Sequence, residues 1–168
     1  PAQPVPFSHA THAGKLGMDC RYCHNTVESA SHAAVPPTQT CMNCHTQIHR
    51  ESPRLEKVRD SYETGMPIEW IKVHKIGDYA YFNHAAHVTR GVSCVECHGR
   101  VDTMEVVHRV KPLSMSWCLE CHRDPIDAVR PPSEVFNLAK STTATWSEEE
   151  RKALINQYLI QPSENCST

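Results

Sequence analysis

The pattern of hydrophobic and polar positions along the chain predicts short helices joined by long irregular stretches. No segment shows a convincing strand pattern of alternating apolar and polar residues. Residues 52–63 are rich in charged side chains and read as helical. Near the end of the chain, Ser147 and Glu150 have the spacing of a capping box, which predicts a helix that Pro162 ends. The apolar positions of this helix are Leu154, Ile155, Tyr158 and Leu159.

The apolar side chains are too few to build a large core. Aromatic residues make up 7% of the 168 residues, twelve prolines stand against six glycines, and the mean hydropathy is −0.50. Such a chain has few bulky side chains to offset the conformational entropy that is lost on folding. We therefore expect something other than side chains to fill part of the interior.

Charge and hydropathy argue against two classes of protein. The formal net charge is −2, whereas a nucleic-acid-binding domain normally carries a basic excess. No run approaches the roughly 18 apolar residues of a membrane-spanning helix. The chain begins at Pro1 and not at a methionine, which leaves room for an export signal or an anchor before it.

Eight of the nine cysteines supply a candidate for the missing core. They fall into four C-x-x-C-H segments, the attachment signature of c-type haem. Two cysteines at this spacing can form thioether bonds to the two vinyl groups of the macrocycle, and the next histidine then lies beneath the iron as its proximal ligand. The predicted attachment cysteines are Cys20, Cys23, Cys41, Cys44, Cys94, Cys97, Cys118 and Cys121. The predicted proximal ligands are His24, His45, His98 and His122.

Zinc and disulfides are the alternatives for these cysteines. Seventeen residues separate Cys23 from Cys41 and twenty separate Cys97 from Cys118, which fits the spacing of a zinc ribbon. Eight thiols could also form four disulfides in an exported protein. Neither alternative requires a histidine directly after the second cysteine, yet one follows in all four segments. The histidines therefore favour haem c.

The chain is internally duplicated. The segment PFSHATH, from Pro6, is matched by YFNHAAH, from Tyr81, and Cys20 and Cys94 are 74 residues apart. Each half runs F-x-H-x-x-H, C-x-x-C-H, a loop containing Val and Pro, and a second C-x-x-C-H, as expected for one unit used twice. We divide the chain into a first dihaem repeat (1–51), a connecting segment (52–77), a second dihaem repeat (78–125) and a C-terminal helical region (126–168).

The F-x-H-x-x-H segments supply candidate distal ligands. His9 and His12, like His84 and His87, are three residues apart and would share one face of a short helix. Two such neighbours cannot serve the same iron, because the motif histidine already occupies one side of it. They can reach two adjacent haems instead. An exposed surface histidine is the ordinary alternative, but the element occurs twice, each time shortly before a haem motif.

The remaining histidines divide by their surroundings. His74 lies in the apolar-rich segment EWIKVH, and we predict that it is a fifth distal ligand. His32, His49 and His108 lie in polar or loop sequence and should face solvent. Methionine is a possible axial ligand too, but packing is the simpler role for Met104 and Met115.

Cys166 stands apart from the paired cysteines. Followed by Ser167 and Thr168, it spells the first three positions of a fifth C-x-x-C-H. The ordered helix predicted before it suits a packed haem site more than a fraying tail. The alternative is a free thiol on a disordered end. We expect Cys166 to begin a fifth haem motif.

The order of these motifs resembles a known family. The segments are PFSHATHAGKLGMDCRYCH, VPPTQTCMNCH, GMPIEWIKVH, YFNHAAHVTRGVSCVECHGRVD and LSMSWCLECHRDP. Over nearly the whole chain they resemble the pentahaem cytochrome c subunit of alternative complex III, a bacterial membrane complex that oxidises quinol. The resemblance implies proximal roles for the four motif histidines and distal roles for His9, His12, His74, His84 and His87. The chain departs from the family in that the fifth motif stops after Thr168.

The resemblance also implies a location and partners. The subunit would lie on the extracytoplasmic (periplasmic) face of the cytoplasmic membrane and relay electrons from the quinol-oxidising core to a periplasmic carrier. Its partners would be an iron–sulfur subunit, quinol-site membrane subunits and a monohaem cytochrome c. An anchor before Pro1 or docking to these partners would hold it at the membrane. Covalent haem attachment and paired cysteines suit that compartment.

These features predict an electron carrier and not an enzyme. A haem with two axial ligands has no open coordination site and cannot bind a substrate. A multihaem reductase would need one haem with a vacant face, whereas the histidines here exceed the number of complete motifs. A free periplasmic shuttle, or an electron-transfer subunit of a molybdenum oxidoreductase, is an alternative that these residues leave open.

Overall fold

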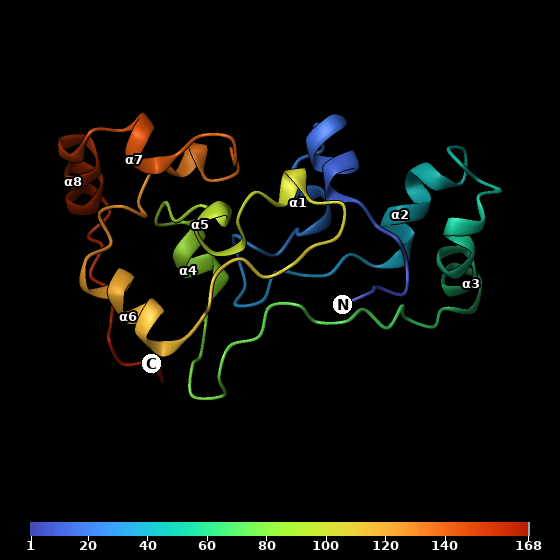
Figure 1. The fold of residues 1–168 in the computed structure, drawn as a ribbon, viewed down its shortest axis with the longest axis horizontal. Coiled ribbons are helices and arrows are strands. Elements are labelled where there is room, and N and C mark those ends of the chain that lie inside the picture. Colours follow the sequence, from blue (N-terminus) through green and yellow to red (C-terminus); the bar gives the residue numbers. More distant parts are fainter. Residues whose placement is uncertain (168) are drawn as a thin grey trace.

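The protein is an elongated chain of short helices and long irregular connections. The computed structural model describes residues 1–167 and shows α2 and α3 at one end and α6, α7 and α8 at the other (Figure 1). The α-helices are α1 (Cys20–Cys23), α2 (Thr38–His45), α3 (Glu56–Thr64), α4 (His84–Val88), α5 (Cys94–His98), α6 (Met115–Arg123), α7 (Thr142–Thr145) and α8 (Glu148–Gln157). A π-helix, η1 (Ala10–Lys15), and the 3₁₀-helices η2 (Pro53–Leu55), η3 (Val101–Thr103) and η4 (Pro132–Glu134) complete the regular structure of the described residues.

The prediction of short helices without strands is confirmed. Over residues 1–167 the only β-type pairing is an isolated antiparallel bridge between Val92 and Val129. The charged stretch at residues 52–63 is helical, as η2 and α3. The fold is therefore mostly irregular backbone with short α-helices.

Side-chain caps set where several of these helices begin. Ser114 accepts a hydrogen bond from the backbone of Trp117 at the start of α6, and Asn83 accepts one from Ala86 at the start of α4. Such caps satisfy backbone N–H groups that have no partner inside the helix. Both capped helices carry histidines of the sequence motifs, so the caps fix the start of two site-bearing elements.

The capping box that opens α8 is present, but the helix is shorter than predicted. Ser147 and Glu150 exchange the two reciprocal hydrogen bonds of the motif. The helix ends at Gln157 and does not run on towards Pro162. Leu159 has a φ of 49° and an exposed side chain, so the backbone has left the helix and the expected apolar face stops early.

The side-chain core is small, as the composition indicates. One buried cluster contains Val5, Met42 and Val58, and the other contains Val27, Val88 and Val135. The second cluster joins residues from both halves of the chain, because Val27 follows α1 whereas Val88 ends α4. Two clusters of three buried residues leave much of the interior to something other than aliphatic packing.

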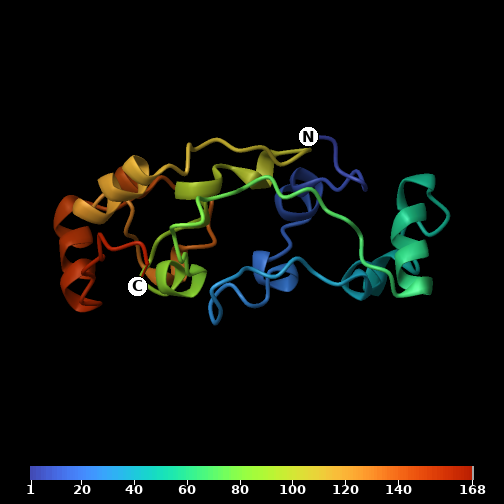
Figure 2. The same cartoon turned by 90° about the horizontal axis from the view of Figure 1, so that it is seen from below.

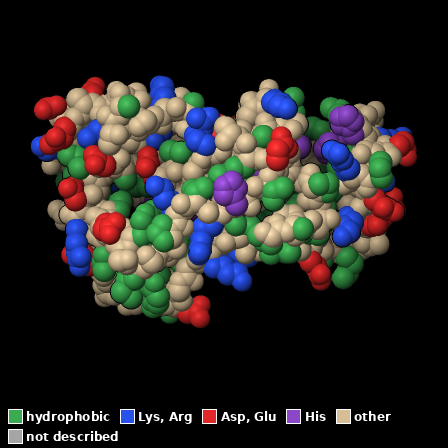
Figure 3. Space-filling model, viewed as in Figure 1, with side chains coloured by type: hydrophobic (Ala, Val, Ile, Leu, Met, Phe, Trp, Pro, Cys, Tyr) green, Lys and Arg blue, Asp and Glu red, His purple; other side chains and the backbone are tan. Residues whose placement is uncertain are grey.

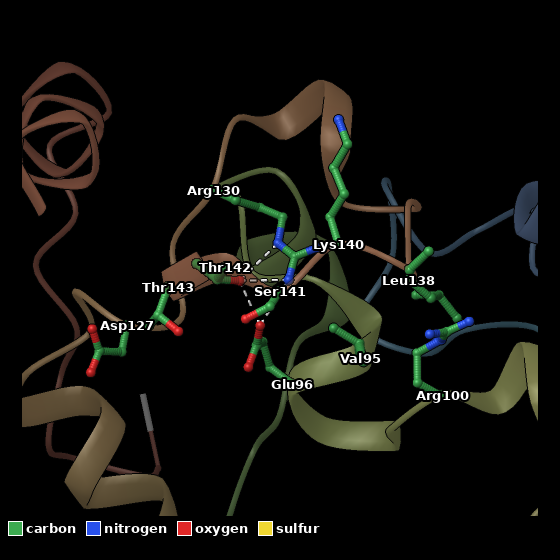
Figure 4. Close-up of a pocket in the computed structure, with 11 residues that line it drawn as sticks. Val95, Glu96, Arg100, Asp127, Arg130, Leu138, Lys140, Ser141, Thr142 and Thr143 are labelled. Atoms are coloured by element: carbon green, nitrogen blue, oxygen red, sulfur yellow. Dashed lines mark hydrogen bonds and ion pairs between the residues drawn. The ribbon is translucent and has the colours of Figure 1, made fainter. Parts of the chain in front are cut away.

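A buried arginine braces the second half. The Arg130 side chain is fully buried and lies beside a cavity of about 480 Å³. Its guanidinium donates hydrogen bonds to Glu96 (2.9 Å), to Thr142 (2.9 and 2.5 Å) and to the backbone oxygen of Asn137 (3.1 Å). Figure 4 shows Arg130 and Glu96 pointing towards each other where both meet Thr142. Arg130 thus connects Glu96 of α5 to Thr142 of α7. Removing either partner would leave its buried charge less well paired, which is costly.

The surface carries charges of both signs. Lysine and arginine side chains are interspersed with aspartate and glutamate over the face drawn in Figure 3, without a large region of one sign. No helix among residues 1–167 has the length and apolar character needed to cross a bilayer.

Candidate haem-binding sites

Each C-x-x-C-H motif lies on or directly after a short helix. Motif one forms α1 with His24 as its C-terminal cap, motif three is α5, and motifs two and four lie within α2 and α6. Residues three and four apart share one face of a helix, so two thiols and the following imidazole project to the same side. All nine cysteines are free thiols.

Every motif histidine faces one histidine of an F-x-H-x-x-H segment. The ring centres are 6.5 Å apart for His9 and His24, 6.2 Å for His12 and His45, 6.4 Å for His84 and His98, and 6.0 Å for His87 and His122. The predicted distal and proximal residues are thus brought together in four pairs. In the first half the ring planes are inclined at 5° in one pair and 66° in the other, and in the second half at 8° and 40°.

These spacings fit an iron held between two imidazoles. A bond from a metal to imidazole nitrogen is about 2 Å long and the nitrogen lies about 1.2 Å from the ring centre, so two axial rings on one iron have centres roughly 6.4 Å apart. The observed range of 6.0 to 6.5 Å matches this value. Direct ring stacking or a hydrogen bond between the rings would bring the centres closer. The residues present therefore fit haem with two histidine ligands.

Backbone carbonyls fix the orientation of six of these eight rings. A carbonyl oxygen can only accept, so the Nδ1 atom facing it must carry the proton, and Nε2 keeps the lone pair that binds a metal. The motif histidines bond in this way to the oxygens of Ala34 (His24, 2.7 Å), Ile48 (His45, 2.9 Å) and Ser163 (His122, 2.5 Å). Their opposing histidines bond to the oxygens of Ser8 (His12, 2.8 Å), Ser31 (His84, 2.9 Å) and Asn83 (His87, 2.7 Å).

Sequence reasoning missed these carbonyl partners. A backbone oxygen belongs to every residue, so nothing in the side chains of Ala34, Ile48 or Ser163 marks the role. The partners of His12 and His87 carry a repeated signal, because a residue four positions earlier supplies the oxygen in both segments.

Burial keeps several of the rings neutral. Removal from water lowers the pKa of His9 and of His98 to about 4, and it lowers the pKa of His87 as well. The neutral imidazole is the form that binds a metal, since the protonated ring has no free lone pair. Among the described residues, Nδ1 of His9 is buried without a hydrogen-bond partner.

One phenylalanine in each half contacts both histidines of its segment. Phe7 meets His9 edge-on, with ring centres 4.8 Å apart, and stacks on His12 at 4.5 Å. Phe82 makes the same two contacts in the second half, with ring-centre distances of 4.8 and 4.5 Å. The first residue of F-x-H-x-x-H therefore packs between the two histidines and helps to hold their separation.

The four sites form a row that differs from the order of the motifs in the chain. Along the long axis the helices follow one another as α2, α1, α5 and α6 (Figure 1), and Figure 2 shows the same elongated arrangement from below. The thiols agree with this order. Burial and then the nearby Cys41 raise the pKa of Cys23, whereas burial and then the nearby Cys121 raise the pKa of Cys97 to about 12. Motif two is thus at one end, motif four is at the other, and motifs one and three meet in the middle.

His74 is not opposite any motif histidine. Its ring lies edge-on to that of His98, with centres only 4.3 Å apart, which is too close for two ligands on opposite faces of one iron. Burial lowers the pKa of His74, and its Nε2 is buried without a hydrogen-bond partner among the described residues. Its predicted role as a fifth distal ligand therefore has no partner ring within residues 1–167. The histidines predicted to face solvent, His32, His49 and His108, are exposed.

Cys166 lies in a terminal segment that packs on motif four. Arg123 of α6 forms an ion pair with Glu164 (3.0 Å), and the backbone oxygen of Cys166 accepts a hydrogen bond from Tyr81 (2.8 Å). The thiol lies near Cys118, whose pKa is raised by burial first and by Cys166 second. Thr168, the third position of the predicted fifth motif, lies outside the described residues.

An irregular chain of short helices arranged around four facing pairs of histidines, each beside a C-x-x-C-H motif, is the arrangement expected of a multihaem cytochrome c. No protein-family model matches the chain. The chain is 29% identical to the multihaem cytochrome c subunit of menaquinone reductase from Nitratidesulfovibrio vulgaris (strain Hildenborough). The similarity covers 98% of this chain and 74% of that subunit. The chain is therefore similar, along almost all of its length, to a multihaem cytochrome c subunit.

Proposed function

We propose that this chain is an electron-transfer subunit of a quinone-linked membrane complex and that it holds haem c at each of its four facing histidine pairs. The observation that carries the proposal is the spacing of 6.0 to 6.5 Å within all four pairs. The paired cysteines would hold the macrocycle at Cys20 and Cys23, Cys41 and Cys44, Cys94 and Cys97, and Cys118 and Cys121. The axial ligands would be His24 with His9, His45 with His12, His98 with His84, and His122 with His87.

The residues suit electron transfer and not catalysis. A bound haem supplies one-electron redox chemistry at its iron. The two histidines of each pair would hold the iron between them, so they would leave no open position at the metal for water or a substrate. The carbonyl oxygens orient the imidazole rings, and the attachment cysteines would fix the position of the macrocycle. Each site would therefore change little in structure between its oxidised and reduced states. The row of sites along the long axis suits passage of electrons from one end of the molecule to the other.

The relative supports a quinone-linked partner complex, and two directions of electron flow are possible. The first is the oxidation of quinol, as in alternative complex III, with an iron–sulfur subunit, quinol-site membrane subunits and a monohaem cytochrome c as partners on the extracytoplasmic face. The second is the reduction of quinone, which the name of the menaquinone reductase relative favours. Purified native complex separates the two directions. In the first, a menaquinol analogue reduces the haems and a cytochrome c acceptor oxidises them, whereas in the second a reduced carrier drives quinone reduction.

Cys166 and His74 extend the proposal to a fifth haem. Cys166 would provide its first attachment thiol, and the buried Nε2 of His74 would provide a distal ligand. The packing of the terminal segment on α6 supports an ordered site next to motif four.

The test is the haem content of the natural protein, purified without denaturation. Intact mass should exceed that of the polypeptide by five haem c groups, and electron paramagnetic resonance (EPR) of the oxidised protein should show only low-spin iron. A mass excess of four, with Cys166 open to alkylation, would contradict the fifth site and leave the other four. A high-spin haem that binds cyanide or nitrite would overturn the electron-carrier proposal in favour of a reductase. Bound zinc in place of haem would overturn it altogether.

A further inference from the structure

The loop between α1 and α2 contacts histidines of two different sites. We call residues 26–34 the linking loop. Its Ala34 oxygen accepts a hydrogen bond from Nδ1 of His24 (2.7 Å), which belongs to motif one. Its Ser31 oxygen accepts one from Nδ1 of His84 (2.9 Å), which faces the motif-three histidine, His98. Two oxygens three residues apart thus orient ligand rings from opposite halves of the chain.

These two contacts differ in kind from most of the other carbonyl contacts. His12 and His87 each bond to the residue four positions earlier, and His45 bonds three positions ahead, so the local turn supplies the oxygen automatically. The contact of His84 spans 53 residues, and that of His24 spans ten. Such oxygens reach their rings only if tertiary structure holds the loop in place.

One hydroxyl closes the linking loop. Oγ1 of Thr26 donates to the backbone oxygen of His32 (2.8 Å) and accepts from the backbone N–H of Ala34 (2.9 Å). It therefore bridges the stretch that contains both ring-orienting oxygens. The next residue, Val27, is buried against Val88 and Val135, which fixes the loop to the helix that begins with His84.

The hydrogen bond from a histidine ring to a carbonyl oxygen affects the reduction potential of a metal bound to that ring. An Nδ1–H group that donates to a carbonyl makes Nε2 a more basic ligand. A more basic axial ligand stabilises the oxidised iron and lowers its reduction potential. Loosening the linking loop would weaken this effect at the His24 site and the His84 site together.

We infer that Thr26 is a positioning residue for the axial ligands of two haem sites, so that the linking loop sets the reduction potentials of both sites jointly. The inference rests on the proposed function, because it needs haem at the His9–His24 and His84–His98 pairs. It goes further by assigning a shared control to two sites that lie in different halves of the chain.

The experiment compares Thr26→Val with Thr64→Val in the natural haem-loaded protein. Thr64 is a matched control, because its Oγ1 also donates to a backbone oxygen, of Asp60, and accepts a backbone N–H, of Met66, at the end of α3. Spectroelectrochemical titration should show two haem components shifted to higher potential in Thr26→Val, with the others unchanged. EPR should show altered signals for the same two haems. Thr64→Val should leave all components in place, and Thr26→Ser should restore them.

Several results would overturn the inference. A Thr26→Val protein with unchanged potentials, or with one shifted component, would show that the loop does not act on two sites. Equal shifts in Thr26→Val and Thr64→Val would mean a general loss of packing. If Thr26→Val does not assemble, Thr26→Ala removes the same hydroxyl without putting a methyl group in its place. Its potentials are then judged by the same criteria. A wild-type protein without low-spin haem would refute the proposed function and this inference together. If the wild-type spectra show low-spin haem and the Thr26 variants fail the criteria above, only the inference about the linking loop is refuted.

Discussion

The two F-x-H-x-x-H segments reach the same ring geometry through different backbones. Phe7 and Phe82 contact their two histidines at the same pair of distances, 4.8 and 4.5 Å. Yet the first segment leads into a π-helix with His9 at its start, whereas the second forms an α-helix that Asn83 caps. The π-helix is a rare element that is often found at functional sites. The comparison teaches that the geometry of the rings is repeated and the backbone beneath them is not.

The supports of the two segments differ as well. His84 is held by Ser31 from across the molecule, but Nδ1 of His9 is buried without a partner among the described residues. The second half is further braced by Arg130 and by the approach of Gly91 to the Arg130 backbone. The position of the His9 ring therefore depends more on the proposed haem than the position of the His84 ring does.

The largest expected effect comes from removing one distal ring in each half. His9→Ala and His84→Ala should each convert one haem from low spin to high spin, because one axial position loses its ligand. EPR of the oxidised protein reports the change, and His108→Ala, at an exposed histidine outside the linking loop, is the control. His84→Ala should also lower the melting temperature more than His9→Ala, since it releases the linking loop. Equal melting temperatures would break the comparison between the halves.

A smaller effect is expected from a methyl group at two glycines that each follow an F-x-H-x-x-H segment. Gly91 has a φ of 88°, and a Cβ there would lie 2.1 Å from the backbone oxygen of Arg130. Gly17 has a φ of 64° and open space around it. Gly91→Ala should cost about 3 kcal/mol of unfolding free energy, whereas Gly17→Ala should cost about 1 kcal/mol from the backbone conformation alone.

Denaturant unfolding of the haem-loaded variants measures both glycine costs. Similar losses at the two positions would show that the second half is not the more tightly braced one. A Gly17→Ala loss larger than that of Gly91→Ala would reverse the comparison.

The smallest effect concerns one exposed ion pair in each half. Arg21 lowers the pKa of Asp19, and Arg100 lowers the pKa of Asp102, in both cases mainly by donating side-chain hydrogen bonds. A carboxyl group whose pKa is lower in the folded state stabilises the fold above its unfolded pKa of about 4, and this stability is lost as the pH falls through the folded pKa. Asp102→Asn should therefore destabilise the protein at pH 7 by about 0.5 kcal/mol, and the loss should shrink steadily as the pH falls below about 4.

Asp19→Asn should cost less, because the Asp19 side chain is 47% exposed against 19% for Asp102. Thermal melts over a series of pH values from 7 down through the acid range, with and without added salt, distinguish the variants. A loss that does not shrink as the pH falls would contradict the assignment to a charged carboxylate.

Much of the candidate site could be predicted because its chemistry lies in side chains at fixed spacing. The four C-x-x-C-H motifs and the two F-x-H-x-x-H segments contain all eight rings that face each other in pairs. The residue types do not mark which distal ring faces which motif, although within each half the observed pairs follow chain order. The order of the sites along the row could not be predicted, because it differs from the order of the motifs in the chain. The carbonyl partners were hidden as well, since Ser31 meets His84 only through the folding of two distant segments.

The fold was predictable in kind and less so in detail. Absent strand patterns and the capping box at Ser147 both carried over into the structure. The end of α8 did not, because the apolar pattern continues to Leu159 while the backbone turns out of the helix there. His74 lies in apolar sequence as expected, but its position beside His98 depends on how the connecting segment returns along the molecule.

The half-buried thiols of motif three bear on the order of assembly. Burial raises the pKa of Cys94 to about 11 and that of Cys97 to about 12, so both sulfurs are protonated at neutral pH. A protonated thiol is a poor nucleophile, and a partly enclosed one is harder for a bulky reagent to reach. If haem is attached at this motif as proposed, attachment would be faster before the chain folds around these thiols than after. A polypeptide that folds first would then be slow to take up its prosthetic group.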